Sequence, residues 1–359
     1  MIDKEYLGFN LLSDVNPHPT TDFDNLTFST SNEDIAKVEK DVASNVVRVT
    51  ANHARRYGEA VISARNDVTG YYGMFTVLVK PNDGITVPVV AATNSGVYAL
   101  KADGTVWTWG NTYDGSTSSM VNRTSPVRVV KNVGKDSTTY LENIKHIAAG
   151  PTHMLAVDTD GQVWALGNNA NGKLGIGGTS TAYTPTLVKT SSTEILSGVE
   201  RVAAGARNSA ALAQDGVVYV WGDNTYGQNG DWTTDNNERH YLPLQVRDIS
   251  KADQSTGNTT GRLKNITAIS AKNNQSFAIN EEGYLYGWGY NGQRQLGINN
   301  SSNQTLPQKV LKGQTNNDES YIKFVSNVAA GTNNTVAELD DGYVSVSYTH
   351  LTLPTTSRV

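Results

Sequence analysis

Short runs in which apolar and polar residues alternate recur along the chain from about residue 89 onward. A first set of runs reads AATNSGVYAL, AAGPTHMLAV, AAGARNSAAL, SAKNNQSFAI and AAGTNNTVAE, beginning at Ala91, Ala148, Ala203, Ser270 and Ala329. A second set follows and reads TVWTWG, QVWALG, VVYVWG, YLYGWG and YVSVSY. Alternation with a period of two residues is typical of β-strands that bury one face, and these segments have no helical period. The pattern predicts an all-β fold.

A tight turn separates the two runs of every unit. The turns are Asp103-Gly104, Asp160-Gly161, Asp215-Gly216, Glu282-Gly283 and Asp341-Gly342, at intervals of 55 to 67 residues. Such a pair supplies the positive φ that a tight hairpin turn needs. An Asn- and Gly-rich loop then leads to a strand start near Pro126, Pro185, Pro243 or Pro307. The fixed period predicts a repeat protein with about four short strands in each unit.

The order of these features resembles the repeat of the regulator of chromosome condensation family over about residues 85 to 345. The shared features are the apolar hairpin, the Asp-Gly turn, Trp-Gly, a Gly-x-Leu-Gly loop and Pro-x-x-Val. The resemblance implies a β-propeller whose complete form has seven four-stranded blades. Four full units and part of a fifth are visible, because Val344 is followed by SVSYTHLTLPTTSRV instead of Trp-Gly. We therefore expect residues 345–359 to be a non-native tail, with a divergent terminal strand as the alternative.

Residues 1–80 have a different character, with short alternating runs separated by polar turns. The runs include Leu26–Ser29, Ile35–Val38, Val47–Val49 and Phe75–Val79, which fits a small β-sandwich. STSNEDIAKV at residues 29–38 and YGEAVISA at 57–64 resemble a group 2 bacterial immunoglobulin-like domain. A linker rich in turn formers is expected at residues 81–88, and the truncated propeller at residues 89–344.

Composition excludes several classes of function. The formal net charge of −5 leaves no basic excess for a nucleic acid or an acidic membrane surface. The absence of cysteine excludes disulfides and thiolate chemistry. No apolar run reaches the roughly 18 to 20 residues of a membrane span, so direct membrane insertion is not expected. Met1–Glu5 lacks the order of a signal peptide, so the protein is either cytoplasmic or lacks its native start.

Each candidate catalytic or metal-binding motif lacks residues that its chemistry requires. Gly167–Lys173 matches a phosphate-binding loop as far as its lysine, but Leu174 replaces the required Ser or Thr and no helix follows. Asp158–Gly161 opens like a calcium loop but lacks its later glycine and glutamate. The six histidines are scattered, and no Gly-x-Ser-x-Gly elbow is present. We expect no enzyme activity, no cofactor and no metal.

Recurring aromatic and polar positions are assigned to the core. The set expected to be structural comprises Trp109, Gly110, Trp164, Gly167, Trp221, Gly222, Trp288 and Gly289, and Trp107 lies in the same strand as Trp109. We interpret these tryptophans as one repeat position that packs between blades. His153 stands where other units carry Gly96, Asn208, Gln275 and Asn334, so we expect a polar side chain that ties neighbouring strands together.

The loops that follow Trp-Gly fall on one face of the expected propeller. They bring Tyr113, Tyr226 and Tyr290 toward a common surface, and exposed tyrosines on a rigid scaffold suit recognition. Trp232, with Tyr183 and Tyr241, could extend this surface, although ordinary partial burial explains these three equally well. We take Tyr113, Tyr226, Tyr290 and Trp232 as candidate binding residues.

The sequence favours a non-enzymatic module that binds a protein or a glycan, within a secreted or cell-surface bacterial protein. The alternatives are a guanine-nucleotide exchange factor for a small GTPase, and the carrier or inhibitor region of a larger secreted hydrolase. The acidic charge and the bacterial-type first domain count against the exchange factor. The identity of the partner stays open at this stage.

Overall fold

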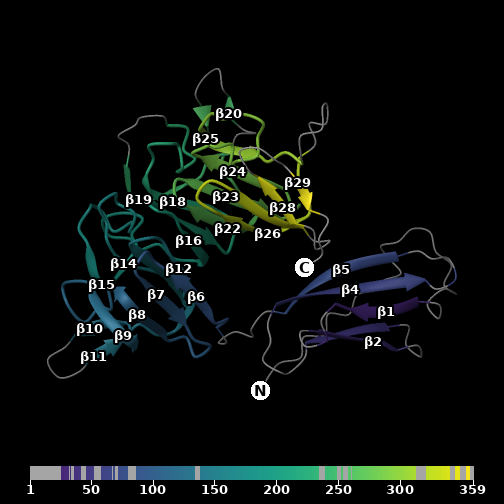
Figure 1. Ribbon diagram of the computed structural model, residues 1–359, viewed down its shortest axis with the longest axis horizontal. Coiled ribbons are helices and arrows are strands. Elements are labelled where there is room, and N and C mark those ends of the chain that lie inside the picture. The colour runs from purple at the N-terminus through teal and green to yellow at the C-terminus, as the bar shows by residue number, and fades with distance from the viewer. Residues whose placement is uncertain are drawn as a thin grey trace. The chain divides into compact units, whose positions relative to one another are not determined.

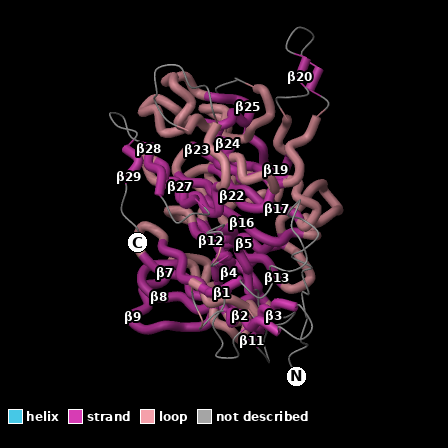
Figure 2. Tube along the Cα trace, turned by 90° about the vertical axis from the view of Figure 1, so that its right-hand side faces the viewer, coloured by secondary structure: helices cyan, strands magenta, loops and turns pink. Residues whose placement is uncertain are grey.

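The chain divides into two compact units, residues 1–85 and residues 86–359. The computed structural model describes residues 26–31, 33, 36–41, 46–51, 58–66, 68, 72–79, 86–133, 138–233, 239–248, 252–253, 258–259, 261–312, 321–339, 344–347 and 353–355. Throughout these residues the regular structure is β, and no helix is present (Figure 2). The predicted all-β fold class is confirmed for them.

The first unit contains two separate groups of strands. β1 (Leu26–Thr30), β4 (Gly58–Asn66) and β5 (Tyr72–Val79) form an antiparallel sheet in the order β1-β4-β5, and β2 (Ala36–Asp41) pairs with β3 (Val46–Ala51). Ala60 and Ile62 are fully buried on one face of β4, as an alternating strand requires. Two small sheets in one compact unit are compatible with a sandwich.

The second unit contains five antiparallel sheets of four strands each, here called blades 1 to 5. Blade 1 comprises β6 (Val89–Ala92), β7 (Gly96–Leu100), β8 (Val106–Thr112) and β9 (Val121–Arg128). Blade 2 comprises β12 (Ile144–Ala149), β13 (His153–Asp158), β14 (Val163–Gly167) and β15 (Ala182–Leu187). Blade 3 comprises β16 (Val199–Ala204), β17 (Asn208–Ala213), β18 (Val218–Asp223) and β19 (Arg239–Gln245).

Blades 4 and 5 repeat this order. Blade 4 comprises β22 (Ile266–Lys272), β23 (Gln275–Asn280), β24 (Leu285–Gly289) and β25 (Gln304–Lys309). Blade 5 comprises β26 (Val325–Ala330), β27 (Thr335–Leu339), β28 (Val344–Ser347) and β29 (Leu353–Thr355). Two short ladders, β10 (Val130–Val133) with β11 (Thr138–Tyr140) and β20 (Ala252–Asp253) with β21 (Asn258–Thr259), lie between blades. The outer strands of blade 5 come from the segment in which the Trp-Gly motif is lost, and the non-native origin of that segment stays a prediction.

The blades follow one another along an arc (Figure 1). In every blade the spatial order of the strands equals their order in the chain. The first strands of neighbouring blades lie against each other, as β12 does with β6 and β16, and β22 with β16 and β26. The first strand is therefore the inner one and the fourth the outer one. None of the described sheets closes on itself.

A separate apolar core lies between each pair of neighbouring blades. Between blades 2 and 3, for example, Leu155 and Leu174 pack with Val202 and Trp221, all of them buried. Equivalent cores join blade 1 to 2, blade 3 to 4 and blade 4 to 5. One unit alone cannot bury both of its faces, so each blade depends on its neighbours, as in other repeat proteins.

A hydrogen-bonded contact, here called the clasp, links the loop of one blade to the next blade. The main-chain carbonyl of Lys173 in blade 2 accepts hydrogen bonds from Trp221 Nε1 (2.8 Å) and Ser209 Oγ (2.7 Å) in blade 3. The carbonyl of Gln228 accepts from Trp288 Nε1 (3.0 Å) and Ser276 Oγ (3.2 Å) in blade 4. At the boundary of blades 4 and 5, Thr335 Oγ1 donates to the carbonyl of Gln295 (2.9 Å).

The tryptophans occupy two repeat positions, so the interpretation of a single position was wrong. Trp221 and Trp288 directly precede Gly222 and Gly289 near the end of the third strand, and both are fully buried in the clasp. Leu166 stands at that position in blade 2. Trp164 and Trp107 lie two residues closer to the start of the strand and are only half-buried. Spacing by two residues keeps all of them on one face of the strand, which explains why the two positions look alike in the sequence.

Trp109 has the clasp position in blade 1 but is only half-buried. The loop of a preceding blade covers Trp221 and Trp288, whereas no described residue donates such a loop to blade 1. The structural role expected of Trp109 is thus weaker than that of the two fully buried indoles.

The Asp-Gly and Glu-Gly turns also contact the next blade. The carbonyl of Gly216 accepts a hydrogen bond from Ile266 N (3.1 Å), and Gly104, Gly161 and Gly283 make the same bond. Gly216 has a φ of 75°, and a Cβ there would lie 2.9 Å from Asn265 N. Only glycine satisfies both the conformation and the close approach. The turns predicted from the sequence therefore also fix the distance between blades.

The prolines lie inside the outer strands, whereas the sequence suggested that they begin them. Pro126, Pro185, Pro243 and Pro307 fall within β9, β15, β19 and β25. Each of these strands has a register irregularity against the third strand of its blade. An outer strand tolerates proline because the missing N–H has no partner strand to serve.

Replacing Trp221 with alanine is expected to lower the free energy of unfolding by about 3 to 5 kcal/mol, because a buried indole and its hydrogen bond to the Lys173 carbonyl are lost. Trp109→Ala is the matched variant and should cost no more than about 2 kcal/mol, since half-buried Trp109 loses less apolar contact. Urea denaturation followed by circular dichroism measures both. Equal losses of unfolding free energy in the two variants would mean that the clasp adds no stability beyond that of a half-buried tryptophan.

Candidate functional site

The loops between the third and fourth strands define one end of the blades, here called the loop face. A buried asparagine closes each loop in blades 2 to 4. The side-chain oxygens of Asn169, Asn224 and Asn291 accept from the main-chain N–H of the residue five positions later, at 2.8, 2.9 and 3.0 Å. These asparagines were not singled out from the sequence. Each stands two residues after the recurring glycine of its third strand, which is Gly167, Gly222 or Gly289. The loops are thus held both internally and by the clasp.

Tyr226 and Tyr290 form an aromatic pair across blades 3 and 4. Their ring centroids are 5.0 Å apart with an interplanar angle of 65°, an edge-to-face arrangement. Both side chains are half-buried. Such pairs combine a large apolar surface with two phenolic hydroxyls, which suits molecular recognition. The structure therefore brings together two of the three predicted tyrosines.

Tyr113 has a different neighbour. Its ring lies 6.0 Å from that of Tyr183, at an angle of 56°, and links the loop of blade 1 to the outer strand of blade 2. Burial, reinforced by Tyr183, raises the pKa of Tyr113 above its ordinary value. Tyr241 occupies the corresponding place in blade 3 and lies directly over Gly172, where a Cβ would be 2.6 Å from its ring. Aromatic residues on outer strands thus cover the loops of the preceding blade.

Trp232 adopts a left-handed backbone conformation with a φ of 76°. Its main-chain N–H donates to the carbonyl of Thr305 in blade 4 (3.1 Å). Gly177 holds the same place in blade 2, with a φ of 81° and a bond to the Tyr241 carbonyl. Asn299 holds it in blade 4, with a φ of 59°. A tryptophan at a position otherwise filled by Gly or Asn is strained by roughly 1 to 2 kcal/mol.

Side-chain contacts of an aspartate fix the loops of blades 1 and 3, an ion pair with arginine in blade 1 and a hydrogen bond with histidine in blade 3. In blade 3, Asp231 Oδ2 lies 2.6 Å from His240 Nε2, and in blade 1, Asp114 Oδ2 lies 2.7 Å from Arg123 Nη2. Burial alone would raise the pKa of Asp231, but hydrogen bonds from His240 and Thr233 outweigh it and hold the pKa below its usual range. The pKa of Asp114 is lowered against burial by Ser116 and Arg123 in the same way. Both carboxylates therefore serve the loop and are not free for catalysis.

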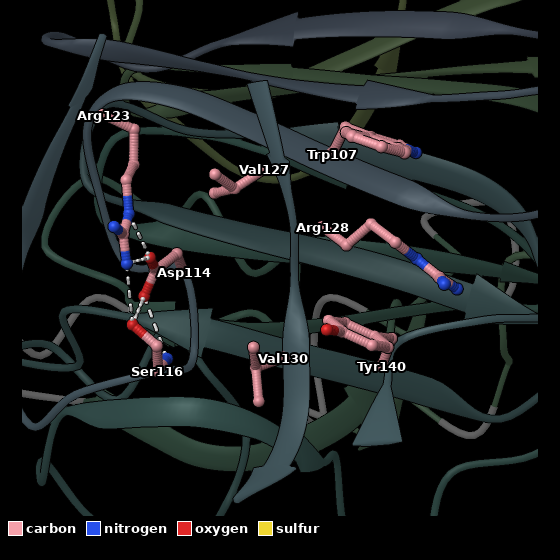
Figure 3. Close-up of a pocket in the computed structure, with 8 residues that line it drawn as sticks. All are labelled: Trp107, Asp114, Ser116, Arg123, Val127, Arg128, Val130 and Tyr140. Carbon is pink, nitrogen blue, oxygen red and sulfur yellow. Dashed lines mark hydrogen bonds and ion pairs between the residues drawn. The ribbon is translucent and has the colours of Figure 1, made fainter. Parts of the chain in front are cut away.

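A pocket of about 350 Å³ opens on blade 1, lined by Trp107, Asp114, Ser116, Arg123, Val127, Arg128, Val130 and Tyr140 (Figure 3). Arg128 lies between Trp107 and Tyr140, while Arg123 turns toward Asp114 and Ser116 (Figure 3). In blade 2 the equivalent tryptophan, Trp164, is covered by Lys131, whose Nζ lies 4.1 Å from the ring centroid. Lys131 belongs to the segment between blades 1 and 2. In blade 1 a cation also lies over the tryptophan, with Lys101 Nζ 5.4 Å from the ring centroid of Trp107. We assign no small-molecule ligand to this pocket.

Two histidines lie at the boundary of blades 2 and 3, His153 fully buried and His146 half-buried. His153 Nε2 is 3.0 Å from Ser209 Oγ, and His146 Nδ1 accepts from Val202 N (3.4 Å). Because Ser209 donates its proton to the Lys173 carbonyl, His153 must donate from Nε2. Burial lowers the pKa of His153 to about 3 and that of His146 to about 4, with nearby cations adding to both shifts. Both rings are therefore neutral near pH 7.

The equivalents of His153 make corresponding bonds. Asn208 Nδ2 donates to Ser276 Oγ (3.3 Å), and Gln275 Nε2 donates to the carbonyl of Gly331 (2.6 Å). The predicted role of this position, a polar side chain that joins neighbouring strands, is confirmed, and the strands belong to successive blades. Within the described residues, no group of three His, Cys, Asp or Glu side chains could hold a metal ion. The same part of the chain has no helix long and apolar enough to span a membrane.

His153→Asn is expected to reduce the acid sensitivity of folding. A neutral buried histidine contributes stability that is complete above about pH 6.5 and is lost as pH falls toward its folded pKa, because the unfolded chain takes up the proton first. The variant should flatten the stability curve between pH 6.5 and 3 by up to about 1.4 kcal/mol per pH unit. Urea titrations at successive pH values measure this slope. An unchanged slope would show that His153 is not held neutral, and Asn208 provides the precedent that Asn fits this position.

Sequence comparison places the repeats among known proteins. The model of the family described as "RCC1-like domain" matches residues 66–347. The ultraviolet-B receptor UVR8 of Arabidopsis thaliana is 27% identical over 279 residues, 74% of this chain and 58% of that protein. The human X-linked retinitis pigmentosa GTPase regulator is 30% identical over 169 residues, 47% of this chain and 15% of that protein. Protein RCC1 of Candida albicans is 29% identical over 192 residues, 50% of this chain and 39% of that protein.

The chain therefore spans little more than half of UVR8 and smaller shares of the other two relatives. Solved structures resemble it in fold. Yeast RCC1 (Prp20), in its crystal structure with Kap60, aligns with a TM-score of 0.54 at 18% identity, covering 81% of this chain and 68% of the other. Human WBSCR16 aligns with a TM-score of 0.54 at 18% identity, covering 84% and 79%. At such low identity, these likenesses concern the fold alone.

Proposed function

Because the chain belongs to the RCC1-like domain family, whose model matches residues 66–347, we propose that it is a non-enzymatic module that binds a macromolecular partner, a protein or a glycan, through its loop face. Function in such propellers is expected on loops presented by a rigid scaffold. In this chain the loops are fixed by buried asparagines and by the clasp. A preorganised surface loses little conformational entropy on binding.

The observation that carries this proposal is the Tyr226–Tyr290 pair. Half-buried tyrosines on fixed loops have the chemistry of interface hot spots, which are enriched in Tyr, Trp and Arg. Trp232 lies in the same blade 3 loop as Tyr226 and holds an unfavourable backbone conformation. Strain at a surface aromatic residue is consistent with a role in binding, since folding alone would favour Gly or Asn there.

The proposed setting is a secreted or cell-surface bacterial protein in which a small immunoglobulin-like domain precedes the propeller. The resemblance of residues 29–38 and 57–64 to bacterial group 2 immunoglobulin-like domains supports it. The two strand groups of the first unit, β1-β4-β5 and β2-β3, are compatible with such a sandwich. In this setting the first domain would act as a spacer, and the loop face would be the surface that binds the partner.

Guanine-nucleotide exchange on a small GTPase is the second candidate, favoured by the match to Candida albicans RCC1. Yeast Prp20p, which has the same fold, has been solved in a study of its binding to Gsp1p and histones. The net charge of −5 argues against contact with chromatin. We expect no acceleration of labelled GDP release from Gsp1p when this chain is added. Acceleration would favour exchange activity over a purely binding role.

Replacing Tyr226 and Tyr290 together with serine should weaken partner binding by at least about tenfold, since hot-spot tyrosines typically contribute 2 kcal/mol or more. The measurement is quantitative capture of surface proteins and arrayed glycans on the immobilised chain, with dissociation constants for the ligands found. Tyr140→Ser with Tyr321→Ser is the matched control, because these exposed tyrosines precede the inner strands of the next blades and are not part of the two loops that carry Tyr226 and Tyr290. Equal weakening in both double variants would contradict the assignment.

A further inference from the structure

Lys173 is a buried cation on the loop face. It is 4% exposed, and its Nζ donates a hydrogen bond to Thr152 Oγ1 (2.9 Å). Thr152 itself is exposed, so the hydrogen bond joins the covered Lys173 side chain to a residue at the surface. Thr152 is the one acceptor that the described part of the chain supplies to this ammonium group, which has three N–H donors.

A second cation, Arg207, acts on the charge of Lys173. Burial, reinforced by Arg207, lowers the pKa of Lys173 to about 8, so the side chain remains mostly charged at neutral pH. Arg207 is exposed and lies at the inner turn of blade 3, and no ion pair of Arg207 is found among the described residues. Asp223, whose N–H binds the Arg207 carbonyl, uses its own carboxylate for Thr225 and Gln228. The hydrogen bond from Ser209 Oγ to the Lys173 carbonyl (2.7 Å) joins the strand that begins just after Arg207 to the loop of Lys173. Neither cation forms an ion pair among the described residues, and burying the charge of Lys173 without an ion pair is costly for the folded state.

Both residues depart from the repeat. Gln228 and Gln295 stand at the position of Lys173 in blades 3 and 4, and their side-chain oxygens bind the main-chain N–H of Tyr226 (2.8 Å) and Gln293 (2.9 Å). A neutral glutamine therefore closes the loop through a main-chain hydrogen bond, and Gln228 also donates its Nε2 to Asp223, whereas Gln295 Nε2 is buried without a partner among the described residues. Arg207 is likewise matched by Thr152 in blade 2 and Asn274 in blade 4. Folding does not require positive charge at either place.

We propose that Lys173 and Arg207 form a receptor for a carboxylate group of an acidic protein segment that lies across the loop face. This inference rests on the proposed function and names the chemistry of its partner. The planar guanidinium group of Arg207 can donate two parallel hydrogen bonds to a carboxylate. The ammonium group of Lys173 has two further N–H donors for the same carboxylate, because only one is used by Thr152. The position equivalent to Lys173 in the next blade, Gln228, bonds directly to Tyr226. The two cations lie in blades 2 and 3, and the Tyr226–Tyr290 pair lies in blades 3 and 4. This arrangement fits a peptide that has acidic residues beside apolar ones.

The test uses N-acetylated decaglutamate as the acidic peptide, with binding to the full chain measured by calorimetry at low salt. Lys173→Gln introduces the residue that blades 3 and 4 already carry, and Arg207→Asn introduces that of blade 4. Each should weaken binding by about tenfold or more, because one partner of a close charge pair is removed. Lys264→Gln removes the same charge at an exposed position and should leave the affinity within about twofold.

Equal weakening by Lys264→Gln would overturn the proposal in favour of general electrostatic attraction, and full affinity of Lys173→Gln would overturn it outright. Galacturonate decamers that bind more tightly than decaglutamate would overturn the choice of a protein segment and indicate an acidic glycan. Should Lys173→Gln fail to fold, acetylation of Lys173 in the wild-type chain, followed by peptide mass spectrometry, gives the answer. Decaglutamate should protect Lys173, and unprotected Lys173 would refute the site. If Lys173 and Arg207 prove irrelevant while Tyr226 and Tyr290 remain necessary, the proposed function stands and only the carboxylate receptor fails.

Discussion

The clasp between successive blades is the interaction on which the rest of the second unit depends. One main-chain carbonyl in a loop receives an indole N–H and a hydroxyl from the next blade, at Lys173 for blade 3 and at Gln228 for blade 4. The indole that donates is also the largest side chain in the apolar core between the blades. Core packing and loop position are thus joined in a single side chain. A change that loosened the core would also move the loops that form the proposed binding surface, because the same atoms hold both.

The residues found at one repeat position in different blades show which chemical property the fold requires at that position. The position of His153 accepts Asn or Gln because it needs only an N–H donor for the next blade, and both amides supply one. The Gly-containing turns accept no substitute, because a Cβ at Gly216 would press against the backbone of blade 4. Asp231 with His240 and Asp114 with Arg123 show a third pattern, in which an aspartate closes the loops of two blades through two different partners. The repeat therefore provides an internal comparison for judging each side chain.

The sequence predicted the hairpins, their turns and the family resemblance because these depend on local spacing, and the structure retains them. It did not separate Trp107 and Trp164 from Trp221 and Trp288, since residues two apart in a strand face the same side and differ only in what covers them. It also placed Tyr113 with Tyr226 and Tyr290, whereas Tyr113 packs on Tyr183. That contact depends on the register of the outer strand of blade 2, which carries an irregularity at Gly167. Contacts between blades are set by such details, which no local pattern encodes.

Trp232 and Lys173 share a property that the local rules of folding do not explain. Each is less favourable for the folded state than the residue that another blade has at the same place: Gly or Asn for Trp232, and Gln for Lys173. The cost arises differently, from backbone strain in one case and from a buried charge without a counter-ion in the other. Both residues lie in loops of the loop face, where the clasp and the buried asparagines make the backbone rigid enough to bear the cost. Local conflicts of this kind are expected where a fold carries function. Their placement on the face that also carries the Tyr226–Tyr290 pair supports the proposal that this face binds the partner.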